Sequence, residues 1–187
     1  MAELREEIRV KIGNDSKVLY EGGAENVKAF DNTHKTGNII RIALLAAAGI
    51  ILFVLYMTKT VNPNTLFGII LIVLFLYIGF AEVLGCMKFK KYNYYLTETH
   101  LISDMDTNVS IIPLNEISSY RYSKDADGHN SLVIGKIKGD GYKLRSLGSA
   151  PARFEEDGSC SEAVFYAVSN FEDFKKAFEQ QMEKNKK

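Results

Sequence analysis

Tryptophan is absent from this chain of 187 residues, and cysteine, proline and histidine occur only two, three and three times. Cys86 and Cys160 lie far apart, show no CxxC spacing and have no neighbouring histidine, so neither a disulfide framework nor a metal site is expected. Both are predicted to be free thiols. Cys86 is interpreted as a small apolar filler, with palmitoylation as the alternative.

Sequence motifs of catalysis are also missing. His34, His100 and His129 stand in separate segments, and there is no HExxH, nucleophile elbow, Walker loop or GxGxxG. The glycines between residues 135 and 141 are typical of a turn rather than of a phosphate-binding loop. The chain is therefore predicted to be a non-enzyme without a cofactor.

An excess of charge is absent as well, because 23 basic residues balance 23 acidic ones. Residues 92–187 hold 12 Lys and Arg against 15 Asp and Glu, so this part is slightly acidic. Nucleic-acid binding needs a clustered basic face, and this composition argues against it. It also weakens the case for strong binding to anionic lipid.

Long apolar runs, in contrast, are present. Ile42–Met57 and Leu66–Ala81 each contain sixteen residues without a charge. Buried helices of a globular domain would show polar residues at helical period, which neither run does. Because about twenty apolar residues cross a bilayer, the runs predict a transmembrane helical hairpin over residues 38–87, with spans at about 39–57 and 66–87.

The positions of Lys and Arg predict an orientation for this hairpin. Basic residues are concentrated before the first run and after the second, whereas the connection holds one lysine, Lys59. Cytoplasmic flanks are enriched in Lys and Arg. The chain is thus expected to be a multi-pass protein of the cell membrane, in contact with the lipid bilayer and with both termini in the cytoplasm.

Two charges border the apolar runs at matching distances from the connection. Arg41 and Glu82 could form an intramembrane ion pair, could each reach interfacial water or lipid phosphate, or could serve transport or gating. Small residues at four-residue spacing would allow close packing of the two helices. These candidate packing residues are Ala43, Ala47, Ala81 and Gly85.

After residue 88 the pattern changes to short alternating segments that indicate antiparallel strands. A C-terminal helix follows at about 170–184, with Ser169 or Asn170 as its N-cap and three phenylalanines on one face. The domain is predicted to span residues 88–187. Its strands are expected at residues 92–96, 100–103, 109–112, 118–123, 131–138, 142–147 and 163–169.

The N-terminal part, residues 1–37, is predicted to hold a β-hairpin and a linker. Residues 8–12 and 17–21 alternate on either side of the turn residues 13–16. An isolated hairpin is marginally stable, so these strands are expected to join the later sheet or another subunit. The linker is expected at residues 22–37.

Two stretches, YYLTETHLI at residues 94–102 and IPLNEISSY at residues 112–120, resemble the pattern of bacterial PH-like (pleckstrin-homology-like) domains. Such domains often follow a two-helix membrane hairpin, and the resemblance extends over residues 39–182. It implies an α+β membrane protein in which a PH-like antiparallel β-barrel or sandwich, capped by a C-terminal helix, follows the hairpin. For some relatives it implies roles in envelope stress or bacteriocin immunity.

Two groups of residues are candidates for headgroup or partner contacts. Lys136, Lys138, Lys143 and Arg145 alternate along two predicted strands, where they would form either one basic stripe or an ordinary solvated face. The fifteen residues 148–162 depart from the family pattern. This segment is either a recognition loop, with Arg153 and Phe154 as contacts, or a disordered hairpin connection.

Together these features predict a non-catalytic binding or scaffolding protein with a PH-like domain at the cytoplasmic face. The alternative is an accessory subunit of a larger membrane complex, of transporter or secretion type, assembled through the hairpin. A protein partner or a homo-oligomer is expected in either case.

Overall fold

The computed structural model describes residues 5–13, 16–28, 31–58, 68, 84–105 and 108–185. The chain forms two compact units. The two-sheet unit comprises Met1–Val27 and Lys88–Lys187, and the inserted segment comprises Lys28–Met87. Each is described by itself.

The described part of the inserted segment contains the long helix α2 (Lys35–Met57). Asp31 precedes it and accepts hydrogen bonds from the backbone N–H of His34 at 2.9 Å and from His34 Nδ1 at 2.8 Å. These bonds stabilise the turn that leads into the helix. Several apolar side chains of α2 are exposed, among them Ile42, Leu44, Ile50 and Phe53.

Among the residues that the structure describes, no helix combines the length and the apolarity that crossing a membrane requires. α2 begins with polar residues and contains Arg41, and the sixteen uncharged residues that follow fall short of the about twenty needed. The predictions of a transmembrane hairpin, of a multi-pass membrane protein and of a place in the cell membrane are therefore wrong. The second predicted span lies largely outside the described residues.

The first sheet has the antiparallel order β1-β2-β3-β4. Its strands are β1 (Val18–Gly23), β2 (Tyr92–Thr97), β3 (His100–Met105) and β4 (Asn108–Pro113). Thr97 Oγ1 accepts the backbone N–H of His100 at 2.9 Å and closes the β2–β3 turn. After β4, the short 3-10 helix η1 (Leu114–Glu116) leads to the second sheet.

The second sheet has the antiparallel order β5-β6-β8-β7. Its strands are β5 (Tyr120–Lys124), β6 (Asn130–Gly135), β7 (Arg153–Phe154) and β8 (Cys160–Phe165). The fold class predicted for the whole chain is thus corrected to an α+β fold with two antiparallel sheets. The membrane component of that prediction has no counterpart in the described residues.

Helix α4 (Gly141–Gly148) occupies the position of the strand predicted at residues 142–147. The preceding strand, predicted to reach residue 138, ends at Gly135. Positive φ angles at Gly135 and Gly139, of 82° and 115°, turn the chain out of the sheet. The alternation in this segment is too short to distinguish a strand from a short amphipathic helix.

Helix α1 (Glu6–Ile12) stands where the first strand of the N-terminal hairpin was expected. Ile8, Val10 and Ile12 alternate as in a strand, but Ile8 and Ile12 also lie four residues apart, on one helical face. Those two side chains are buried, whereas Val10 is 73% exposed. The second expected strand corresponds to β1, which pairs with β2.

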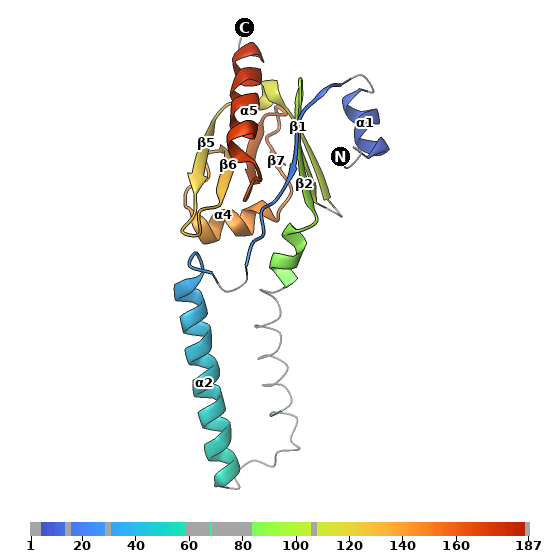
Figure 1. The fold of residues 1–187 in the computed structure, drawn as a ribbon. Coiled ribbons are helices and arrows are strands. Elements are labelled where there is room, and N and C mark those ends of the chain that lie inside the picture. The colour runs from blue at the N-terminus through green and yellow to red at the C-terminus, as the bar shows by residue number, and fades with distance from the viewer. Residues whose placement is uncertain are drawn as a thin grey trace. The chain divides into compact units, whose positions relative to one another are not determined.

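Helix α5 (Phe171–Asn185) packs against residues of both sheets, as its place in Figure 1 indicates. The Phe174 ring lies 5.0 Å from the ring of Tyr20 in β1, and the Phe178 ring lies 5.0 Å from that of Tyr120 in β5. β1 and β5 are outer strands of their sheets. The helix therefore covers the apolar side of both edges.

The core between the sheets is formed by large side chains that are almost fully buried. Tyr94 of β2 is one of these, and its hydroxyl donates a hydrogen bond to the Tyr166 carbonyl oxygen at 2.9 Å. This bond satisfies a polar group in an otherwise apolar interior. Other core members are Leu96, Leu101, Ile112, Leu132, Phe165, Phe174 and Phe178.

Candidate functional site

An open groove of about 550 Å³ lies where β8 begins, beside the ends of β6 and β7. This volume is in the range of pockets that bind small ligands or short segments of a partner, roughly 300–1,000 Å³. Hydroxyl groups, two cations, two carboxylates and one aromatic ring line it. The lining residues are Ser118, Ser119, Gly135, Lys136, Arg153, Phe154, Glu155, Ser159, Cys160, Ser161 and Glu162.

The groove opens because the first two residues of β8 have no partner in β6. The last β6–β8 partners are Gly135 and Glu162, whereas β8 extends two residues further, to Cys160. Gly135 has a φ of 82°, and its backbone N–H donates to the Ser119 carbonyl oxygen at 2.9 Å. A Cβ atom at this position would stand 1.7 Å from the Ser161 carbonyl oxygen, so glycine permits the close approach.

The β7–β8 hairpin forms the opposite wall. Its tip is closed by a hydrogen bond from the Glu155 N–H to the Ser159 carbonyl oxygen at 2.9 Å. Asp157 Oδ1 accepts bonds from the Ser159 N–H at 2.9 Å and from Ser159 Oγ at 2.6 Å. These hydrogen bonds lower the pKa of the exposed Asp157 carboxyl. The segment 148–162 thus contains a hydrogen-bonded hairpin.

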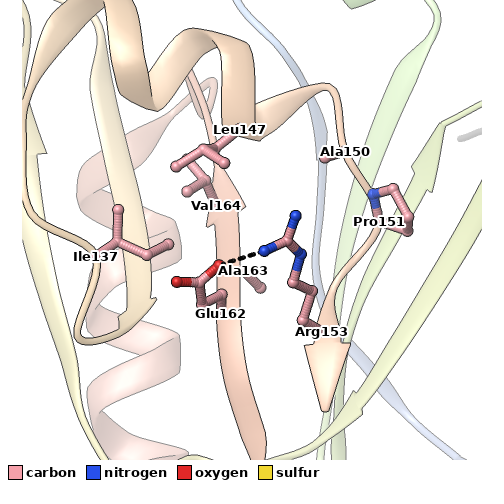
Figure 2. A pocket seen from close by; sticks show the side chains of 8 residues that line it. All are labelled: Ile137, Leu147, Ala150, Pro151, Arg153, Glu162, Ala163 and Val164. Carbon is pink, nitrogen blue, oxygen red and sulfur yellow. Dashed lines mark hydrogen bonds and ion pairs between the residues drawn. The ribbon is translucent and has the colours of Figure 1, made fainter.

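Contacts on both sides of β7 fix this wall in place. Arg153 Nη1 lies 3.3 Å from Glu162 Oε2 of β8, an ion pair that Figure 2 shows. Ser161 Oγ donates to the Arg153 carbonyl oxygen at 3.2 Å. The Ala152 N–H donates to Ser110 Oγ of β4 at 3.0 Å, which joins this wall to the first sheet.

A second, apolar pocket lies next to Arg153 and has almost no internal space. Its volume is about 10 Å³, near the lower limit for one water molecule. Figure 2 shows Leu147 and Val164 close together on one side and Pro151 on the other. The interior behind β7 is therefore packed, whereas the groove in front of it has room for a ligand.

The exposed groups of the groove are suited to recognition. Phe154 is 45% exposed, although an aromatic ring gains free energy from burial. The Lys136 side chain is also exposed, and it has no ion pair among the residues described. An aromatic ring and a cation beside several hydroxyl groups can hold an apolar side chain, a carboxylate and a peptide backbone.

The thiol in the groove is not suited to nucleophilic chemistry. Cys160 is 1% exposed, and burial raises the pKa of its thiol to about 11. A thiol with this pKa stays protonated at neutral pH, whereas thiolate is the reactive form. Cys160 therefore acts as a packed side chain beneath the groove.

Three of the residues predicted for headgroup or partner contacts meet in this groove: Lys136, Arg153 and Phe154. The other three lie elsewhere. Lys138 is exposed in the loop before α4, Lys143 is exposed on α4, and Arg145 is buried on α4. The basic stripe does not form, because its second half lies on a helix.

Sequence reasoning missed the serines and the glycine of the groove. Ser118 and Ser119 precede β5, whereas Ser159 and Ser161 border the start of β8, and no local pattern connects them. Their proximity follows from the pairing of β5, β6 and β8. The only signal in the sequence was the group of closely spaced glycines that begins at residue 135, and this group predicts a turn rather than a groove.

The predicted helix packing and the predicted intramembrane ion pair depend on residues that the structure does not describe. Ala81 and Glu82 lie outside the described residues, as does the Arg41 side chain. Ala43 and Ala47 are exposed on α2. A Cβ atom at Gly85 would meet nothing within 4 Å.

A separate polar cluster lies at the β5–β6 turn. Asp125 Oδ2 accepts a hydrogen bond from the Tyr166 hydroxyl at 2.5 Å and lies 3.1 Å from His129 Nδ1. Asp125 Oδ1 accepts the N–H groups of Asp127 and His129. These partners lie in the turn itself or, in the case of Tyr166, directly after β8, which indicates a structural role.

Over the described ranges, no three His, Cys, Asp or Glu residues are grouped as metal ligands would be.

Comparison with protein-family models, with curated proteins and with solved structures found no match to this chain.

Proposed function

We propose that the two-sheet unit is a non-catalytic binding module that holds a short, extended peptide segment of a protein partner in the groove beside β8. The observation that carries this proposal is the extension of β8 past its last β6 partner, beside the exposed ring of Phe154. The resemblance of residues 94–102 and 112–120 to PH-like domains supports a binding role.

The arrangement of the groove favours a peptide in extended conformation. The start of β8 is flanked by β7 on one side only, so a peptide can lie where β6 would have continued. Serine hydroxyls from two elements line the same space and can bond to peptide carbonyl and N–H groups. Phe154 provides an apolar surface for one side chain of that peptide.

The charges of the groove favour a peptide with one acidic side chain over a phosphate group. Lys136 and Arg153 are matched by Glu155 and Glu162, and Arg153 already pairs with Glu162. A site for phosphate would be expected to present several cations without carboxylates. Lys136 is therefore expected to contact one acidic side chain of the peptide.

The test is a selection of linear octapeptides, displayed on phage, against the full-length chain. The best peptide is then titrated against variants by isothermal calorimetry. Phe154→Ala and Lys136→Ala should each raise Kd about tenfold, the loss of roughly 1.4 kcal/mol of binding free energy. Lys138→Ala is the matched control, because Lys138 is exposed but does not line the groove.

Two results would contradict the proposal. Either no peptide is enriched over repeated rounds, or the enriched peptide binds Phe154→Ala and Lys136→Ala as tightly as the unchanged chain. Circular dichroism of both variants checks that the fold is retained.

A further inference from the structure

The face of the first sheet that points away from the second sheet carries an apolar cluster that helix α1 covers, and α1 lies beside that sheet in Figure 1. Ile8 and Ile12 of α1 form a cluster with Tyr95 of β2 and Ile102 of β3, which are register partners. Val109 and Ile111 of β4 pack against the same cluster. The face thus already accommodates a helix with two aliphatic side chains four residues apart.

Asp104, a buried carboxylate at the border of this face, favours a helix that carries a positive charge. The Asp104 side chain is 9% exposed and accepts a hydrogen bond from Arg5 Nε at 2.8 Å, in addition to its ion pair with Arg5 Nη2. Charged groups with so little exposure require a partner of opposite sign. The face therefore fits a helix with a cation three residues before its first aliphatic residue.

Helix α1 is short and weakly capped. The helix has seven residues, its N-cap residue Arg5 makes no side-chain capping bond, and it ends at Gly13 with a φ of 92°. Ile8 and Ile12 are its buried residues. Helices this short are not stable alone in water, so α1 is helical only while it is docked. Elements of this kind open locally at low free-energy cost.

We infer that this sheet face is a helix-binding surface that α1 occupies within its own chain, and that an amphipathic helix of a partner protein binds there by displacing α1. The partner helix carries Arg or Lys at one position and bulky aliphatic residues three and seven positions later, the spacing of Arg5, Ile8 and Ile12. Because the face is free in only a small fraction of molecules, the apparent affinity for the partner is lowered in proportion to that fraction.

The test uses a fluorescein-labelled peptide of residues 1–16 as the probe and fluorescence anisotropy as the readout. The chain with Ile8→Asp and Ile12→Asp, whose own α1 cannot dock, should bind the peptide at least tenfold more tightly than the unchanged chain. Val10→Asp is the matched control, because Val10 is on the exposed side of the same helix. Adding Asp104→Asn to the double variant should weaken binding again.

Hydrogen exchange in the unchanged chain provides a second measurement that does not depend on a variant folding. The α1 amides should exchange at least tenfold faster than those of α5, through local opening. Exchange of α1 only with global unfolding would overturn the inference. So would a folded double variant that does not bind the peptide, or a concentration-dependent dimer that this variant abolishes, which would indicate exchange of α1 between two copies.

Discussion

At the scale of single residues, Gly135 determines the shape of the groove and Asp125 stabilises the β5–β6 turn. Gly135 permits the chain to leave β6 where β8 continues, and Asp125 collects four hydrogen-bond donors in the β5–β6 turn. Both roles depend on atoms from distant parts of the sequence. Each leads to a substitution with a matched control.

Gly135→Ala should destabilise the fold more than Gly158→Ala. Both glycines have positive φ, 82° and 86°, so each substitution adds about 1–2 kcal/mol of backbone strain. At Gly135 the new Cβ would also meet the Ser161 carbonyl oxygen, whereas at Gly158 it would meet nothing within 4 Å. Overpacking adds roughly 1–3 kcal/mol at Gly135 only. Urea denaturation of both variants measures the difference, and equal losses would contradict this account.

Asp125 should contribute stability that is lost in acid. Burial of Asp125 acts to raise its pKa, but hydrogen bonds from Tyr166 and His129 outweigh burial and hold the pKa below its usual 3.8. The folded state therefore favours the carboxylate above about pH 4. This contribution is lost as the pH falls through the lowered pKa.

Asp125→Asn should cost about 1–3 kcal/mol of unfolding free energy at pH 7, because buried donors lose a charged acceptor. The difference from the unchanged chain should shrink below pH 4. Thermal melts between pH 2.5 and 7 measure this dependence. Asp157→Asn is the control, since its exposed carboxyl makes only local bonds, and it should lose less stability than Asp125→Asn. A pH-independent loss at Asp125 would contradict the assignment.

At the scale of elements, an apolar pattern that fits only one period predicts its element correctly. A pattern that fits both the helical and the strand period does not. α5 lies at the predicted place because its three phenylalanines fit the helical period. The carbonyl oxygen of Asn170 accepts the first helical N–H groups, which places the start of the helix there. α1 and α4 were expected as strands because their apolar residues fit both periods. Packing against a sheet decided between these alternatives, and packing is a property of the fold.

The candidate groove shows the same division at the level of elements. Arg153 and Phe154 could be selected from the sequence because they lie in the fifteen-residue segment 148–162, which departs from the PH-like pattern. Lys143 and Arg145 were selected from a strand that the fold does not contain. The serines of the groove could not be selected, because strand pairing alone places them together.

At the scale of the whole molecule, the inserted segment interrupts a pair of neighbouring strands. β1 and β2 are antiparallel partners, and the end of β1 lies beside the start of β2, with Gly23 opposite Asn93. Lys28–Met87 is thus an insertion in the connection between these strands. The two ends it leaves in the two-sheet unit can be joined by a short loop at a small entropic cost.

Replacing residues 28–87 with a linker of about eight Gly and Ser residues should leave the two-sheet unit folded. Its thermal transition should remain cooperative, and its amide NMR spectrum should keep the dispersion of a β-rich fold. Phe174→Ala in the same shortened chain is the reference for a disrupted core, because Phe174 is fully buried. A shortened chain without a cooperative transition would contradict this division of the molecule.

By itself, the sequence determined the local elements whose side-chain pattern allows one interpretation: the strands around residues 92–112, the turn at Thr97–Thr99 and the C-terminal helix. The tertiary structure alone decided the helical state of α1 and α4, the end of β6 at Gly135 and the groove that results. The physical reason is that these features depend on contacts between residues distant in the chain, and local propensity is too weak to select them.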